Sequence, residues 1–281
     1  GRLTLRGFSR SGLATWLDVP ELDCLFDVGA CPLSVLGRRH IFLTHGHADH
    51  AGALLRHSSL RAMTGIRTRA RYFLPSSLVQ RVEALVEAQA ALEGVPIEQF
   101  SAPELHGLEA GQRVRLGERS PLWVEAFDVD HRVASLGYTV FSQRRKLRPE
   151  YTATPGPRLG ELRRAGTIID DEVLEPQLTF IGDCTARTLD DQAHIWRSPV
   201  LVLEATYLRS DERELARARA HTHIEELADA LERHGDASRV EHLVLKHFSM
   251  KYSTAEIRET VRRVVPERFQ ARVRLLLEGG E

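Results

Sequence analysis

Lysine, cysteine and long apolar runs are all scarce in this sequence of 281 residues. No run approaches the roughly 20 apolar residues that a transmembrane helix requires, and no signal peptide opens the chain. The three cysteines, Cys24, Cys31 and Cys184, form no C-x-x-C pair and cannot all pair with one another, which favours a reducing compartment. These absences predict an intracellular, cytoplasmic protein with no membrane partner.

An excess of charge of either sign is also absent. The 38 basic and 39 acidic residues give a formal net charge of -1, so a contact with RNA or DNA has to come from a local basic patch. Only three of the basic residues are lysines, a bias toward arginine that we attribute first to genome composition. Apolar residues make up 42% of the chain, enough for the core of one large α/β domain, and we predict a single domain over residues 1–281.

The most informative segment is Thr44–His50, with the sequence T-H-G-H-A-D-H. It places three imidazoles and one carboxylate directly after the apolar run Ile41–Leu43, where a strand is expected. Four such groups are costly to bury at the end of a strand unless a positive charge compensates them. Divalent cations do so, because neutral histidine nitrogens and carboxylate oxygens are ligands of first-row metals. The segment therefore predicts a metal site rather than a polar turn.

Short strands and longer helices alternate along the chain. Apolar runs bounded by Gly, Pro and Asp predict strands at 3–5, 14–17, 24–26, 41–43, 123–127, 178–181, 200–203 and 242–245. Apolar residues at helical spacing predict one helix that begins near Ala51 and another over about 77–92. Capping-box patterns predict two more helices, one capped by Thr222 and one by Ser253. This alternation indicates an α/β fold.

Four of the predicted strands lead into a residue that can bind a metal. His45, His131, Asp183 and His247 each follow an apolar strand within a few residues. In α/β folds the loops after the carboxyl ends of the strands meet at one edge of the sheet, where ligand sites are found. We therefore expect these four side chains to converge on one site.

Taken in order along the chain, the motifs resemble those of the metallo-β-lactamase superfamily and, in detail, those of the tRNase Z family of tRNA 3′-processing endoribonucleases. His131–Tyr138 resembles the family's H-x-V-x-S-x-G-Y motif, and residues 155–162 resemble its P-G-P-x-x-G-x-L segment. Glu204–Thr206 resembles E-A-T, His221–Thr222 resembles H-S/T, and His247–Tyr252 resembles H-F-S-x-R-Y. The resemblance implies an αββα sandwich, in which two mixed sheets are flanked by helices.

The resemblance also implies two metal ions held by seven side chains: His45, His47 and His131 on the first ion, Asp49, His50 and His247 on the second, and Asp183 as the bridge. Nitrogen and oxygen donors with open positions suit Zn²⁺, which we expect here, although these ligand types alone also allow Mn²⁺ or Fe²⁺. Two such ions activate water against a phosphodiester, and we expect Asp49 to orient that water.

By the same resemblance, Glu204 and His221 supply the proton that the leaving 3′-oxygen needs. A carboxylate beside an imidazole raises the pKa of the imidazole and fixes its orientation, which supports this role. The alternative is that both are ordinary exposed residues.

Contacts to the substrate are predicted in two places. The basic cluster Arg144, Arg145 and Lys146 lies in a short basic arm or loop at about 142–165, and it either clamps an RNA backbone or is a solvated surface loop. The residues after His247 either bind phosphate or lead into the last helix; they are Ser249, Lys251 and Tyr252.

The sequence departs from the family pattern at several points. Gly7–Leu13 replaces the family's G-T-S-A-x-x-P segment. Lys251 occupies the position of the family's arginine, and a lysine cannot bind phosphate in the bidentate geometry of an arginine. The interval 132–182 leaves room only for a short form of the family's RNA-binding arm. A relative with another phosphodiester substrate would show the same reduction.

We therefore predict a two-metal endoribonuclease that removes the 3′ trailer of precursor tRNA, leaving a 3′-hydroxyl on the tRNA, and the resemblance implies a homodimer. One alternative is a hydrolase of the same fold that acts on a small-molecule or cyclic-nucleotide phosphodiester or on a thioester, because metal motifs fix the nucleophile and not the substrate. The other is a non-catalytic RNA-binding relative, against which the seven filled ligand positions argue.

Overall fold

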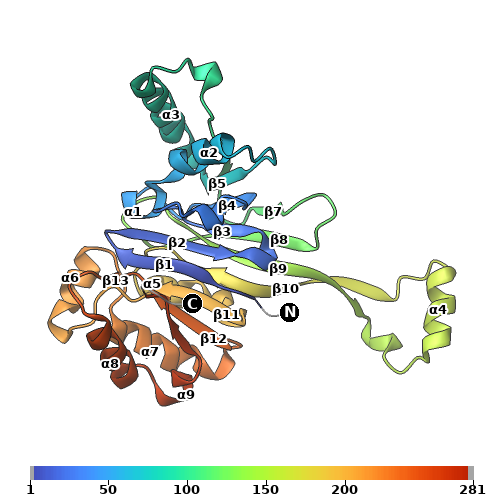
Figure 1. The fold of residues 1–281 in the computed structure, drawn as a ribbon. Helices are drawn as coiled ribbons and strands as arrows, with labels where there is room; N and C mark the ends of the chain where they lie inside the picture. Colours follow the sequence, from blue (N-terminus) through green and yellow to red (C-terminus); the bar gives the residue numbers. More distant parts are fainter. Residues whose placement is uncertain (1–2, 278–281) are drawn as a thin grey trace.

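The computed structural model describes residues 3–277 as two mixed sheets packed face to face, with helices on both outer faces (Figure 1). In spatial order, the first sheet consists of β13 (Phe248–Ser249), β1 (Arg6–Ser11), β2 (Ala14–Val19), β3 (Cys24–Phe26), β4 (His40–Phe42), β5 (Arg71–Pro75) and β6 (Glu104–Leu108). The second sheet consists of β14 (Val273–Leu275), β12 (His242–Lys246), β11 (Val200–Glu204), β10 (Asp170–Phe180), β9 (Leu136–Leu147), β8 (Leu122–Asp128) and β7 (Arg113–Arg115). The predicted αββα sandwich is confirmed.

The helices form two separate outer layers. The first sheet is covered by α1 (Ala48–Ala51), α2 (Leu54–Met63) and α3 (Val79–Glu93) (Figure 1). The second sheet is covered by α5 (Arg187–Asp191), α6 (Arg213–Ala218), α7 (Ile224–His234), α8 (Thr254–Val264) and α9 (Glu267–Gln270). Within residues 3–277, no helix combines the length and the apolar character that crossing a membrane requires.

Aromatic side chains fill the space between the two sheets. The ring centroids of Phe26 and Phe180, which come from opposite sheets, are 5.0 Å apart, and those of Phe42 and Phe73 are 4.8 Å apart. A second apolar cluster lies under the outer helices, where Leu227 of α7 and other apolar residues pack on β11 and β12. The central strands are therefore buried on both faces, which explains why they are nearly all apolar in sequence.

Two local expectations were wrong, and seven strands were not predicted: β1, β5, β6, β7, β9, β13 and β14. Residues 3–5 form no strand, because Leu3 and Leu5 pack against the core between the sheets as irregular chain. His223 and not Thr222 caps α7, because the Thr222 hydroxyl donates to the carbonyl of Cys184 at 2.8 Å. Strand β9 escaped prediction because its second half is polar and basic. The cap of α8 is as expected, with the Ser253 hydroxyl accepting from the backbone N–H of Glu256.

Strands β9 and β10 extend beyond the sandwich as a two-stranded arm that carries α4 (Gly156–Arg164) at its far end (Figure 1). Residues 142–175 include seven basic and six acidic side chains. Some of these pair across the arm, as Arg144 Nε does with Glu175 Oε2 at 3.1 Å and Arg148 Nε with Asp171 Oδ1 at 2.8 Å. The arm therefore presents a basic strand that is partly neutralised by its acidic neighbour.

A buried histidine under the first sheet predicts a loss of stability in acid. His57 of α2 accepts a hydrogen bond at Nδ1 from the Tyr72 hydroxyl (2.7 Å) and donates from Nε2 to the carbonyl of Val35 (3.4 Å). Burial lowers the pKa of His57 from 6.5 to about 4. Since the folded-state pKa is the lower one, the unfolded chain takes up the proton first, and stability falls as the pH drops from 6.5 toward 4, in total by about 3 kcal/mol.

Denaturant unfolding of the wild type and of H57Q across this pH range measures the effect. The other titrating groups are common to both proteins, so the difference between the two curves isolates His57. We expect a shallower loss of stability in H57Q. The same pH dependence in both proteins would contradict the prediction.

Candidate metal and proton-transfer site

Loops that follow four strands of the two sheets meet at one end of the sandwich. His45 follows β4, His131 follows β8, Asp183 follows β10, and His247 follows β12. Each of these side chains lies within at least one of three groups whose ligand atoms are all within 4.8 Å of one another. The convergence expected from the strand ends is therefore present in the fold.

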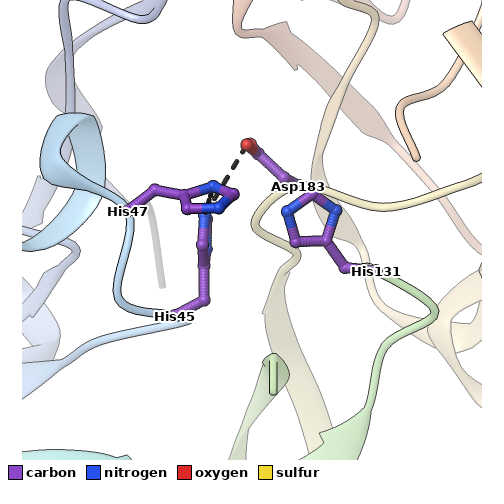
Figure 2. A group of neighbouring side chains, drawn as sticks. All are labelled: His45, His47, His131 and Asp183. Carbon is purple, nitrogen blue, oxygen red and sulfur yellow. Dashed lines mark hydrogen bonds and ion pairs between the residues drawn. The ribbon is translucent and has the colours of Figure 1, made fainter. Parts of the chain in front are cut away.

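The first group consists of His45, His47, His131 and Asp183 (Figure 2). His45 Nε2 lies 2.9 Å from His47 Nδ1 and 3.7 Å from Asp183 Oδ2. The ring centroid of His131 is 5.0 Å from that of His45 and 5.2 Å from that of His47. Three imidazoles and one carboxylate thus surround a common point.

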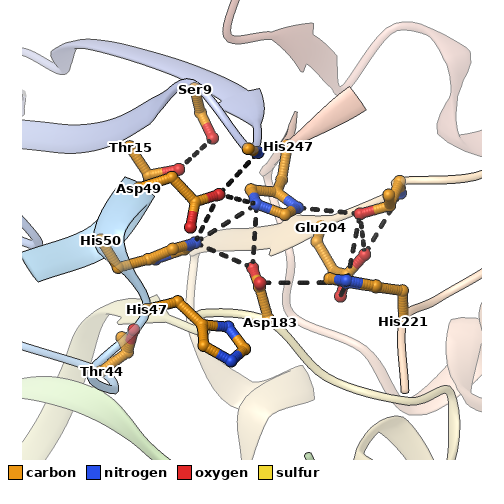
Figure 3. A network of polar contacts seen from close by, with 12 residues as sticks. Ser9, Thr15, Thr44, His47, Asp49, His50, Asp183, Glu204, His221 and His247 are labelled. Atoms are coloured by element: carbon orange, nitrogen blue, oxygen red, sulfur yellow. Dashed lines mark hydrogen bonds and ion pairs between the residues drawn. The ribbon is translucent and has the colours of Figure 1, made fainter. Parts of the chain in front are cut away.

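The second group lies on the other side of Asp183 (Figure 3). His50 Nε2 and His247 Nε2 are 3.3 Å apart, and Asp183 Oδ1 is 3.1 Å from the former and 3.3 Å from the latter. Asp49 Oδ2 is 3.3 Å from His247 Nε2 and accepts a hydrogen bond from the backbone N–H of Gly12 at 2.7 Å. Asp183 therefore turns one oxygen toward each group, as a bridging ligand would.

Hydrogen bonds on the far side of four rings fix which nitrogen faces the site. The partners of Nδ1 are the Ala220 carbonyl for His131 (2.9 Å), Asp27 Oδ2 for His50 (2.7 Å), the Thr44 hydroxyl for His45 (3.0 Å) and the Thr206 hydroxyl for His247 (2.9 Å). Carbonyl and carboxylate oxygens only accept, and the two hydroxyls donate to Asp27 and Glu204, so each ring carries its proton on Nδ1. When these rings are neutral, all four Nε2 atoms present lone pairs to the site.

Lone pairs that face one another across about 3 Å repel unless a cation lies between them. Burial and neighbouring imidazoles lower the pKa of His45, so this ring is neutral at pH 7, and burial likewise lowers the pKa of His131. His131 Nε2 is buried and has no hydrogen-bond partner in the described part of the chain. The donor set of imidazole nitrogens and carboxylate oxygens therefore fits divalent metal ions.

The electrostatics of the second group also favour a positive charge. Burial alone would lower the pKa of His50, but the carboxylates of Asp183 and Asp27 outweigh it and raise the pKa to about 10. A divalent cation satisfies the same carboxylates, and its binding releases the proton that would otherwise be held there.

Asp27 is a functional residue that the sequence reasoning missed. Its side chain is fully buried, and besides His50 it accepts hydrogen bonds from the backbone N–H and the hydroxyl of Thr44. It thereby orients one histidine of each group, a task that partners of metal ligands commonly perform. The signal that could have found it is its position directly after β3, the same strand-end rule that identified Asp183.

The backbone is strained at three positions around the site. Asp27, Ala220 and His247 have positive φ values of 54°, 55° and 64°. Residues other than glycine adopt this left-handed region at an energetic cost, so such outliers are found where the surrounding structure enforces them. Here the strain turns the Ala220 carbonyl toward His131 and presents His247 to the second group.

Glu204 and His221 form a pair that makes up the third group together with Asp183 and His247 (Figure 3). His221 Nδ1 donates to Glu204 Oε1 at 2.9 Å and lies 3.9 Å from Asp183 Oδ2. Glu204 is fully buried and also accepts from the backbone N–H of Cys184 at 2.8 Å. Burial alone would lower the pKa of His221, but the Glu204 carboxylate raises it, which favours a protonated imidazole at this place.

None of the residues predicted to contact substrate belongs to the three groups of potential ligands. Arg144, Arg145 and Lys146 are on the arm strand β9 and are exposed. Ser249 is half-buried on β13. Lys251 and Tyr252 both contact the carboxylate of Glu212, and Tyr252 is buried. Lys251 and Tyr252 therefore hold the loop before α6 against the loop after β12.

Comparison with known proteins places these features in a family context. Residues 22–248 match the family model described as a beta-lactamase superfamily domain. A chloroplastic tRNase Z of Arabidopsis thaliana is 33% identical over 98% of this chain and 75% of its own length, and a second tRNase Z of that plant is 31% identical over 98% and 95%. The crystal structure of the human short-form tRNase Z, 18% identical, has the same fold, with a TM-score of 0.59 over 89% of this chain and 93% of that one.

Proposed function

Since the chain belongs to the β-lactamase superfamily and, within it, to the tRNase Z family, we propose that it is a metal-dependent endoribonuclease that removes the 3′ trailer of precursor tRNA. The cleavage is a phosphodiester hydrolysis that leaves a 3′-hydroxyl on the tRNA. Its substrate partner is therefore RNA.

The observation that carries this proposal is the Glu204–His221 pair next to Asp183. An alkoxide leaves from phosphorus only slowly without a proton, whereas a thiolate needs little help. Because Nδ1 of His221 is bonded to Glu204, the proton for the leaving oxygen comes from Nε2. A half-buried proton donor with a fully buried carboxylate partner therefore supports phosphodiester cleavage over thioester hydrolysis.

We further propose that His45, His47 and His131 hold one ion, that Asp49, His50 and His247 hold a second, and that Asp183 bridges them. The donor set and the orphaned His131 Nε2 support this assignment, with Zn²⁺ as the expected metal and Mn²⁺ or Fe²⁺ as alternatives. When bound, the two ions supply an activated water and stabilise charge on phosphorus. Asp49, held by the backbone N–H of Gly12, is placed to orient that water.

Incubation of the protein with a 3′-extended precursor tRNA tests the proposal. We expect one cut near the end of the mature tRNA and a 3′-hydroxyl on the product. Fast turnover of a cyclic nucleotide or a thioester without tRNA cleavage would favour a hydrolase of another substrate class. Binding of the precursor without any cleavage in metal-loaded protein would favour a non-catalytic RNA-binding role.

The exposed basic residues of the arm are proposed to contact the RNA backbone. Arg145 and Lys146 have no ion pair within residues 3–277, whereas Arg144 is paired with Glu175. Neutralising all three should raise KM for precursor tRNA. It should also make the plot of log affinity against log salt concentration less steep, by about 0.7 to 0.9 for each phosphate that the arm no longer neutralises. The double variant R258Q/R262Q, on the exposed face of α8, is the matched control. If the salt dependence of tRNA binding does not change, the arm is a solvated surface hairpin that does not contact the RNA.

We also propose a homodimer in the cytoplasm. An exposed apolar face on and after α3, with Leu85 at 54%, Leu92 at 80% and Ile97 at 44% exposure, supports association with a second copy. The three cysteines, all free thiols, support a reducing compartment. Sedimentation of the purified protein measures its mass in solution, and a monomer at micromolar concentration would reject the dimer.

A further inference from the structure

One arginine beside the metal-ligating groups has no hydrogen-bond or ion-pair partner within residues 3–277. Arg132 follows His131 directly, in a bend over residues 131–133, and its side chain is exposed. The carboxylate nearest to it in sequence, Asp130, is engaged by the hydroxyl of Thr185. The guanidinium of Arg132 is therefore free to bind an anion.

The contacts of His131, the first residue of the bend, place the bend beside both the metal-ligating histidines and the proton donor. The hydrogen bond from His131 Nδ1 to the Ala220 carbonyl holds the bend against the segment that carries His221. The ring centroid of His131 is 5.6 Å from that of His221 and 5.2 Å from that of His47.

Three other basic side chains around this end of the sandwich are held by protein acceptors. Arg10 donates to the carbonyl of Tyr252 at 2.8 Å, Arg209 pairs with Glu256 at 3.0 Å, and Lys251 pairs with Glu212. These groups would have to break existing contacts before they could bind a substrate. Arg132 would not, which distinguishes it from them.

We infer that Arg132 binds a phosphate group of the RNA strand that neighbours the cleaved phosphodiester. This inference rests on the proposed function. The cleaved group itself faces the metal-ligating residues and His221, so an arginine at their margin meets the next phosphate along the strand. The planar guanidinium offers two parallel N–H donors to two phosphate oxygens, a geometry that fixes position as well as charge.

The test compares the wild type, R132Q and R132K on precursor tRNA. A charge-assisted contact to phosphate is worth about 1.5 to 3 kcal/mol, so R132Q should raise KM by about tenfold or more, a larger factor than any fall in kcat. R132K keeps the positive charge but lacks the two parallel N–H donors of the guanidinium, so its KM should lie between those of the wild type and R132Q. R262Q, which removes an exposed arginine of α8 that has no ion pair within residues 3–277, is the matched control and should leave KM unchanged.

A neutral methylphosphonate placed at single positions of the RNA identifies the contact. At the phosphate next to the cleaved bond, the methylphosphonate should raise KM of the wild type about as much as the R132Q substitution does. In the R132Q variant, the same modification should raise KM little further. An unchanged KM in R132Q, or equal additive losses at every position, would overturn the inference. A wild-type protein that does not cut precursor tRNA would instead overturn the proposed function, so the two failures are distinguishable.

Discussion

Replacing Asp183 with alanine is expected to empty both metal positions at once and to lower kcat/KM for precursor tRNA by about 10³-fold or more, since the two ions supply several kcal/mol of transition-state stabilisation. The reason is geometric. Asp183 Oδ2 faces His45 and Asp183 Oδ1 faces both His50 and His247, so one carboxylate serves the two groups. Asp183 also belongs to two of the three groups of potential ligands within residues 3–277, whereas Asp49 and Glu204 each belong to one.

Metal analysis of the purified variant, together with its unfolding curve, measures this effect independently of activity. H131A is the matched control, because His131 belongs only to the first group and its loss should remove one ion and leave the other. D183N retains the size of the side chain and allows the same measurement if D183A does not fold. Two tightly bound ions in both Asp183 variants would reject the bridging role.

The sequence could locate the residues that converge on the candidate metal site because most of them are marked by their immediate neighbours. His45, His47, Asp49 and His50 lie within six residues of one another, directly after an apolar strand. Asp183 and His247 are each preceded by an apolar run, and in this fold the ends of such strands meet. Local pattern and one rule of topology were sufficient to bring these residues together.

Contacts that depend on the pairing of distant segments were beyond the reach of the sequence. Asp27 touches His50 across 23 positions, and its role follows from the parallel pairing of β3 with β4. The cluster at Arg144–Lys146 looks free in sequence, yet β10 brings Glu175 beside Arg144. Glu212, which engages both Lys251 and Tyr252, carried no signal because acidic residues are common on helical surfaces.

Replacing His221 with alanine is expected to lower kcat on precursor tRNA by about 10²- to 10³-fold, the range of a general acid, while both metal positions stay filled. His221 reaches the site through its pair with Glu204 and is not required by either group of expected ligands, since His131 and His247 have their own partners at Nδ1. The variant therefore separates proton donation from metal binding. H106A, which breaks an imidazole–carboxylate pair of similar length (3.0 Å to Glu104) on an exposed strand, is the matched control.

Substrates with different leaving groups show whether His221 donates a proton or only maintains the shape of the site. An RNA 3′-oxygen needs a proton as it leaves, whereas p-nitrophenolate leaves as a stable anion at neutral pH. If His221 donates that proton, H221A should lose far less activity on bis(p-nitrophenyl) phosphate than on precursor tRNA, and E204Q should follow the same pattern with a smaller loss, because the imidazole remains but its charged partner does not. Equal losses of H221A on both substrates would show that His221 holds the shape of the site and does not transfer the proton.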